Sequence, residues 1–139
     1  MSAEENKAQI RRALRHFNQG DLDGYLDLYA ADAVMHDAGI EPGIDNIRQY
    51  YQGFATAFPD GNVAIEDLVA EDDKLACRYT FTGTHQGPLM GIPPTGNAVT
   101  ISGMTVLRFA SGKCVERWTQ ADFLGLMQQI GVIPAPEHA

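Results

Sequence analysis

Apolar residues in the first half of the chain recur at helical spacing. Between residues 8 and 18 they fall three or four positions apart, which gives a helix one apolar face. These positions are Ile10, Ala13, Leu14 and Phe17. The pattern predicts two further helices: a short one over residues 22–29, which Asp21 would cap, and one that opens at Gly43 and ends at the turn 59–61.

The second half of the chain changes to a period of two, which is the alternation of strands with one buried face. Strands are predicted over residues 63–69, 75–85, 99–109 and 114–121. Short turns join them, except for a loop rich in Gly and Pro over residues 87–96. These strands are therefore expected to pair antiparallel.

The order of elements predicts the fold class. A mixed segment at residues 33–37 indicates a short first strand, and Asp122 begins a closing helix that Gly131 ends. Helices, then long antiparallel strands, then a short helix is the segregated order of an α+β protein. No repeat or linker divides the sequence, so we expect a single domain over residues 1–139.

Charge and cysteine usage narrow the partners. The chain has 139 residues, 18 of them acidic and 10 basic, for a formal net charge of -8. Its basic cluster, Arg11, Arg12 and Arg15, lies among acidic residues and is typical of a solvated helix face, so no nucleic-acid partner is expected. Cys77 and Cys114 each lie in an alternating apolar run, which favours buried free thiols over a disulfide.

Motifs for metals, phosphates and membranes are missing from the sequence. No Cys or His spacing matches a metal site and no glycine motif matches a phosphate loop, so we expect neither metal nor organic cofactor. The N-terminal residues lack the apolar region of a secretory signal, and no run approaches the ~18 apolar residues of a membrane span. The sequence thus predicts a cytoplasmic protein with no membrane partner.

Two segments carry a resemblance to a known family. Residues 83–87 read Gly-Thr-His-Gln-Gly, and residues 90–96 read Met-Gly-Ile-Pro-Pro-Thr-Gly. The C-terminal part continues the pattern with Gly112, Lys113, Trp118, Asp122, Leu126, Gln129 and Gly131. In this register the chain resembles the SnoaL-like polyketide cyclases of the nuclear-transport-factor-2-like superfamily, closely in its second half and more loosely in its first.

The resemblance implies a cystatin-like α+β fold, a cone-shaped barrel in which a bent antiparallel sheet wraps around the N-terminal helices and leaves an internal pocket. It implies an enzyme that closes a ring by an intramolecular aldol reaction without metal or cofactor, with the residue at the position of Asp122 as general acid and base. A homodimer is also expected, through the open sheet face on which Arg78, Thr80, Thr82 and Thr84 would lie.

The proposed chemistry explains why a carboxylate is needed. An aldol closure removes a proton from the carbon next to a carbonyl and returns one to a developing alkoxide or enolate, and a carboxylate in an apolar pocket can do both. Asp122 also directly precedes the closing helix, where an N-cap Asp belongs. Catalysis and helix capping are both open at this point.

Residues near this carboxylate are candidates for the pocket. His85 ends the strand face that holds Tyr79 and Phe81. It would either donate a hydrogen bond, to the substrate carbonyl or to the carboxylate, or tie down the following loop. By alternation Trp118 shares a strand face with Asp122, so it is expected to be an aromatic wall that desolvates the carboxylate.

Residues further from the carboxylate have weaker signals. His36, near the end of the first strand, would line the pocket mouth or lie on the surface. Tyr25, Tyr29, Tyr50 and Tyr51 are expected to pack in the core.

One strand departs from the family pattern. Where the aromatic-polyketide cyclases carry a Gln and a His that face the pocket, this chain has Gly103 and Thr105. The change predicts a roomier and more apolar pocket, and it makes a tricyclic polyketide substrate doubtful. A β-bulge at Gly103 would turn the alternation around and overturn this expectation.

The sequence therefore predicts a cofactor-independent enzyme of cyclase or isomerase type that acts on a small, largely apolar, carbonyl-bearing molecule. Two alternatives stand beside it, because one fold hosts many functions. The first is a non-catalytic domain that binds a small molecule or dimerises. The second is a related pocket enzyme, an epoxide hydrolase or a hydroxylase.

Overall fold

The computed structural model describes residues 2–134. Its elements, in chain order, are α1 (Ala3–Asn18), α2 (Leu22–Leu26), β1 (Tyr29–Met35), α3 (Ile44–Ala57), β2 (Asn62–Glu71), β3 (Lys74–Thr84), β4 (Ala98–Ala110), β5 (Lys113–Ala121) and α4 (Phe123–Gln129). The predicted helices and strands are thus present, with ends shifted by a few residues. No helix in this part of the chain is long and apolar enough to cross a membrane.

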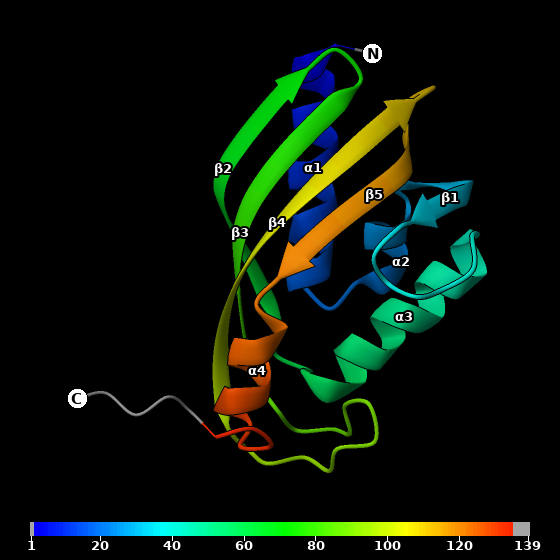
Figure 1. Ribbon diagram of the computed structural model, residues 1–139. Helices are drawn as coiled ribbons and strands as arrows, with labels where there is room; N and C mark the ends of the chain where they lie inside the picture. The colour runs from blue at the N-terminus through cyan, green and yellow to red at the C-terminus, as the bar shows by residue number, and fades with distance from the viewer. Residues whose placement is uncertain (1, 135–139) are drawn as a thin grey trace.

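The sheet confirms the predicted α+β class, with one correction. Its five strands lie in the order β1-β5-β4-β3-β2 (Figure 1). Strands β2 to β5 pair antiparallel as expected, but β1 runs parallel to β5. The sheet is therefore mixed and stays open. The sequence did not indicate the direction of β1, because β1 belongs to no hairpin. Helices precede and follow it, and its partner strand lies far along the chain.

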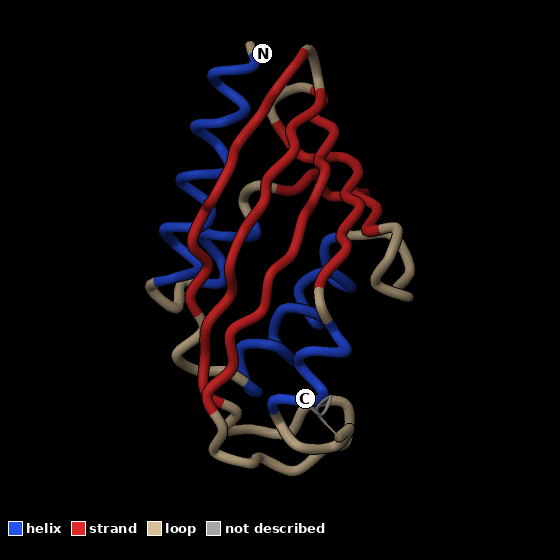
Figure 2. The backbone as a smooth tube through the Cα atoms, turned by 60° about the vertical axis from the view of Figure 1, so that its left-hand side comes forward, coloured by secondary structure: helices blue, strands red, loops and turns tan. Residues whose placement is uncertain are grey.

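Helices α1, α2 and α3 gather on one face of the curved sheet, as Figures 1 and 2 show. The core lies between these layers, and its side chains include Ile10, Tyr25, Ile47, Leu75 and Leu107. Helix α4 and the loop between β3 and β4 lie together at one end of the sheet (Figure 1). On the other sheet face large apolar side chains remain exposed, so that face has no covering layer within the described residues.

A β-bulge changes the alternation of β2. The register with β3 shifts between Ile65 and Asp67, so the inward residues after the bulge are Leu68 and Ala70. The expected continuation of the inner face to Val69 is therefore wrong, and Val69 is 65% exposed. One extra residue in a strand turns every later side chain to the opposite face.

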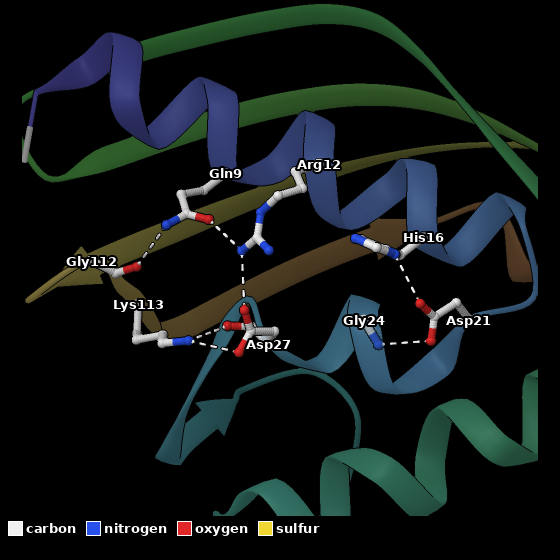
Figure 3. A network of polar contacts seen from close by, with 8 residues as sticks. All are labelled: Gln9, Arg12, His16, Asp21, Gly24, Asp27, Gly112 and Lys113. Carbon is white, nitrogen blue, oxygen red and sulfur yellow. Dashed lines mark hydrogen bonds and ion pairs between the residues drawn. The ribbon is translucent and has the colours of Figure 1, made fainter.

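The ends of the first two helices depend on side-chain caps. The Ser2 hydroxyl accepts from the backbone N–H of Glu5, and the Glu5 carboxylate accepts from the backbone N–H of Ser2, which completes a capping box. Asp21 caps α2 through the N–H of Gly24, as predicted (Figure 3). The second helix is shorter than expected, because Tyr29 already pairs with Cys114 in the sheet.

A polar network joins α1 to the turn between β4 and β5 (Figure 3). Asp27 accepts hydrogen bonds from Lys113 at 3.1 Å and from Arg12 at 3.2 Å, and the Gln9 amide donates to the Gly112 carbonyl at 3.3 Å. Two hydrogen bonds hold the pKa of the Asp27 carboxyl below its usual value. The one from Lys113 has the larger effect and the one from Arg12 the smaller. The network anchors α1 against β5, the strand that carries the site.

Candidate functional site

A cavity of about 130 Å³ lies between the helices and the covered face of the sheet. Aliphatic and aromatic side chains from all four helices line it, and all five strands contribute to its sheet wall, with Met35 from β1 and Val63 from β2 at the two edges. The helix wall includes Ile10, Leu14, Phe17, Phe54 and Leu126. The cavity is thus a largely apolar pocket within the fold, the kind of space in which small molecules bind.

Three of the predicted pocket residues line this cavity. Tyr79 and Phe81 reach it from β3, and Thr105 reaches it from β4. Strand β4 has no bulge between Ile101 and Leu107, so its inner residues keep a strict alternation. Of the aromatic residues expected in the pocket, Tyr79 and Phe81 thus line the cavity.

Gly103 faces the same side of β4, but the space beside it is filled. A Cβ atom added at Gly103 would lie 2.4 Å from the hydroxyl oxygen of Tyr79. The Tyr79 ring occupies the volume that a larger side chain at position 103 would need. The absence of a side chain at Gly103 therefore accommodates Tyr79 and does not itself enlarge the cavity.

The buried charged group that lines the cavity is Arg117, which no sequence pattern singled out. Its side chain comes from β5, and the residue is 9% exposed. Nη1 donates to the hydroxyls of Tyr25 at 2.8 Å and Tyr51 at 2.9 Å, and also to that of Tyr29. Nε donates to the Thr105 hydroxyl at 2.8 Å. A cation and three phenols thus meet at one end of an apolar cavity.

Burial keeps the phenols of Tyr29 and Tyr51 in their neutral form. Removal from water raises the pKa of Tyr29 and Tyr51 well above the usual value, although the Arg117 charge beside them acts in the opposite direction. The same cause raises the pKa of Tyr50, at the cavity wall, to about 12. At neutral pH the tyrosines therefore act as hydrogen-bond donors and acceptors, and not as bases.

A bulge in β5 explains why Arg117 was missed. Glu116 pairs with Arg108 but Cys114 pairs with Phe109, so Val115 is an extra residue in the ladder. Counting by twos from the buried Cys114 puts Glu116, Trp118 and Gln120 on the inner face, whereas the bulge puts Arg117 there instead. The adjacent apolar pair Cys114-Val115 was the signal in the sequence for this break.

Trp118 and His36 are not among the residues that line the cavity. Their rings stack on each other with centroids 4.7 Å apart and planes 10° apart. Trp118 projects from the opposite side of β5 to Arg117, since adjacent strand residues point to opposite faces. In place of the aromatic wall expected at Trp118, β5 presents Arg117, Thr119 and Ala121 to the cavity.

His85 is fully buried, and its imidazole ring binds Thr95 near the other end of the loop between β3 and β4. Its Nδ1 accepts from the backbone N–H of Thr95 at 3.3 Å and lies 3.1 Å from the Thr95 hydroxyl. An accepting Nδ1 leaves the ring proton on Nε2. His85 is not among the cavity-lining residues, so of its two expected roles the structure displays the hold on the loop.

Asp122 caps α4. Its Oδ1 accepts from the backbone N–H of Gly125 at 2.8 Å, whereas Oδ2 forms no hydrogen bond with residues 2–134. The side chain is exposed and does not line the cavity, but its chain neighbours Ala121 and Phe123 do. The carboxylate thus lies at the cavity rim and has one oxygen without a partner.

A second carboxylate, Asp37, lies at an outer hollow of about 270 Å³. This hollow shares Tyr50, Phe54 and Phe123 with the main cavity, so it adjoins the cavity on its outer side and is the candidate entrance. Asp37 Oδ2 accepts from the backbone N–H of Thr119 at 3.1 Å. Nothing in the sequence pattern distinguished Asp37, because the parallel pairing that brings β1 beside β5 is a tertiary contact.

The residues that the structure describes contain no group of three His, Cys, Asp or Glu side chains that could hold a metal ion. Both cysteines are free and buried, as the sequence predicted. Burial raises the pKa of the Cys77 thiol, which lines the cavity, and raises that of Cys114 to about 12, so neither thiol is activated as a nucleophile at neutral pH. The chemistry available at the cavity is therefore that of carboxylates, phenols and one guanidinium.

Comparison with known proteins places this geometry in a family. The SnoaL-like polyketide cyclase family model matches residues 8–130. The aklanonic acid methyl ester cyclase AcmA of Streptomyces galilaeus is 26% identical over 141 residues, which cover 96% of this chain and 94% of AcmA.

Solved structures agree. AclR, a candidate hydroxylase from Streptomyces galilaeus, superposes with a TM-score of 0.89 at 32% identity, over 98% of this chain and 87% of AclR. TsrD from Streptomyces laurentii gives a TM-score of 0.88 at 26% identity, over 96% of this chain and 99% of TsrD. The family match spans nearly all of the described residues, and the predicted resemblance is confirmed: the chain belongs to the SnoaL-like polyketide cyclase family.

Proposed function

We propose that this protein is a cyclase or isomerase that uses no cofactor and acts on a small, apolar, carbonyl-bearing molecule of polyketide type. The observation that carries the proposal is the apolar cavity, which has carboxylates near its rim and the donor groups of Arg117 and the tyrosines in its lining. Such a chamber can hold a flexible substrate with its two reacting ends together, which is worth up to ~7–11 kcal/mol in well-oriented cases.

The proposed acid and base is Asp122. Its free Oδ2 would take the proton from the carbon next to a substrate carbonyl, while Oδ1 remains fixed by the Gly125 N–H. The same carboxyl would then return the proton to the alkoxide that forms when the ring closes. His85 would act as a positioning residue, because its bond to Thr95 holds the loop next to the entrance.

Turnover of carboxylate variants tests this mechanism. The first substrate to try is aklanonic acid methyl ester, on which the relative AcmA acts. Asp122→Asn preserves the cap, because Asn caps helices about as well as Asp, and it should reduce turnover by roughly 10²-fold. Asp32→Asn, at an exposed position of β1, is the matched control and should leave turnover unchanged.

Asp37→Asn separates the two carboxylates at the entrance. If it abolishes turnover while Asp122→Asn does not, Asp37 is the acid and base and Asp122 is only a cap. If both variants keep full turnover, neither carboxylate takes part. A protein that binds these molecules but converts none of them would instead be the binding domain considered above.

A hydroxylase is the second candidate, favoured by the likeness to AclR at 32% identity. The two reactions differ in the mass of the product. An intramolecular aldol closure gives an isomer of the substrate, whereas a hydroxylation adds one oxygen atom. Mass spectrometry of the product therefore distinguishes them.

Homodimer formation through the uncovered sheet face belongs to the same proposal. Met104 and Val106 project from that face of β4 and are 58% and 37% exposed. Val106→Glu would place a charge at the centre of such an interface and should give a monomer by light scattering. A wild-type protein that is already monomeric at micromolar concentration would contradict the dimer.

A further inference from the structure

Arg117 is a buried cation without a carboxylate partner. It is 9% exposed, and it takes part in none of the ion pairs formed by residues 2–134, all of which lie nearer the surface. A guanidinium stays charged at every pH that a protein tolerates, and burying it without an anion is costly. The chain has a net charge of -8, yet no acidic residue between positions 2 and 134 pairs with this arginine.

One nitrogen of this guanidinium remains available. Nε and Nη1 donate to hydroxyl groups of Thr105, Thr119 and the three tyrosines. Nη2 donates to none of the described residues, and it is not among the buried polar atoms that lack a partner, so it retains accessible surface. Because Arg117 lines the cavity, this surface faces the cavity interior.

The tyrosine cluster leaves one hydroxyl proton over. The hydroxyls of Tyr25 and Tyr29 lie 2.7 Å apart and those of Tyr29 and Tyr51 lie 3.1 Å apart, so two of three protons are used within the cluster. The Tyr29 oxygen already accepts from Arg117 Nη1, so it can accept from only one phenol and must donate to the other. The third proton is therefore left on Tyr25 or on Tyr51. Both of these residues line the cavity, and Tyr29 does not.

We propose that Arg117 Nη2 and this tyrosine proton form an oxyanion-binding site at the inner end of the cavity. The ligand would have an apolar body and one anionic oxygen, which supplies the missing counter-charge. No other Lys or Arg lines the cavity within residues 2–134, so this is where an anionic group would be recognised. The inference rests on the proposed function and adds to it that the substrate has an anionic oxygen, which binds at Arg117.

Two sources of such an oxygen are compatible with the site. A carboxylate of the substrate would be anionic throughout. An enolate would be anionic only after proton abstraction, when the electron pair of the C–H bond moves onto the carbonyl oxygen and the proton goes to the entrance carboxylate. Fixed donors aimed at that oxygen would stabilise the charge as it develops.

The test is binding of aromatic probes that differ only in their polar group. The first pair is β-naphthoate, an apolar carboxylate, and methyl β-naphthyl ketone, its neutral counterpart. Wild-type protein should bind the carboxylate at least about tenfold more tightly, since a hydrogen bond to a charged group outweighs a neutral one. For the enolate, the probe is β-naphthol, and its bound form should ionise below its solution pKa.

Arg117→Met removes the charge and keeps most of the volume. It should weaken β-naphthoate binding by about 10- to 100-fold and change ketone binding by less than about threefold. The control is Arg78→Met, the same substitution on β3 at an exposed arginine that pairs with Asp67, and it should alter neither probe. If Arg117→Met does not fold, two other measurements decide whether the site exists. One is the preference of the wild-type protein for the carboxylate, and the other is Tyr51→Phe, which should weaken binding of the carboxylate but not of the ketone.

Each outcome has a definite meaning. A preference for β-naphthoate that depends on Arg117 supports a carboxylate substrate, and ionised β-naphthol without that preference supports an enolate. If the carboxylate binds no more tightly than the ketone and bound naphthol stays neutral, the oxyanion site is overturned. Binding requires no turnover, so a protein that keeps these preferences but cyclises nothing overturns only the proposed function.

Discussion

The two faces of β5 show how differently one strand can be used. Its inner face presents Arg117 to the apolar cavity, where three phenols solvate the charge. Its outer face carries Glu116, which pairs with Arg108 at 3.2 Å, and Trp118, which stacks on His36. On the outer face charges of opposite sign compensate each other in water, whereas on the inner face a positive charge has only neutral partners.

This difference shows that the burial of a charge, and not the number of charged residues, indicates which face of the strand is the candidate functional one. An exposed ion pair such as that of Glu116 contributes little to stability, because water screens it. A buried cation without an anion is expensive, and such groups cluster at functional sites. Substitutions at paired positions on the two faces should therefore have unequal consequences.

The largest effect is expected at Gly103, on the inner face of β4. Gly103→Gln would push the Tyr79 ring into the cavity, because the new Cβ would meet its hydroxyl at 2.4 Å. Overpacking of this kind should reduce the free energy of unfolding by about 1–3 kcal/mol and abolish binding of naphthalene probes. Met104→Gln, its exposed neighbour, should stay within about 0.5 kcal/mol in urea denaturation. Equal effects at the two positions would contradict the assignment of the faces.

The second-largest effect is expected in the cavity wall, when Tyr50 titrates at alkaline pH. Burial raises the pKa of Tyr50 from its usual 10.0 to about 12, so the folded state favours the neutral phenol. The resulting stabilisation is complete below pH 10 and is lost as the pH rises from 10 to about 12. Tyr50→Phe should make the unfolding free energy less dependent on pH in this range, measured by urea denaturation. An unchanged slope would show that Tyr50 is solvated in the folded protein.

Trp118 should matter for stability but not for binding. Trp118→Ala removes the stacked pair with His36 and should cost about 0.5–1.5 kcal/mol. Affinity for the naphthalene probes should stay the same, because Trp118 does not line the cavity. A tenfold loss of affinity, measured by fluorescence titration, would place Trp118 in the site and reverse the two faces of β5.

The smallest effect is expected from Glu116. The hydrogen bond from Arg108 holds the pKa of the Glu116 carboxyl below its usual 4.5. Its contribution to stability is therefore present above pH 4.5 and lost as the pH falls through the lowered pKa. Glu116→Gln should slightly flatten the fall of the melting temperature in acid, and salt should erase the difference between the variant and wild type.

The sequence by itself determined the elements, the α+β class and the family. Helical spacing from residue 8 and strict alternation in β4 are local patterns, and local patterns survive folding when tertiary contacts agree with them. The His85 and Thr95 positions of the family motif also proved to be physically linked, since Thr95 donates to the His85 ring. The cap at Asp122 was predictable for the same reason, as it depends on the three residues that follow.

The inner end of the cavity was decided only by the tertiary structure. A single extra residue, Val115, moves Arg117 to the inner face. Counting alternate residues does not predict such a bulge, because it assumes a period of two along the whole strand. The partners of Arg117 come from α2, β1 and α3, up to 92 positions away in the sequence. Sequence patterns indicate which residues turn inward in one element, but the meeting of a cation with three distant phenols depends on how the elements pack.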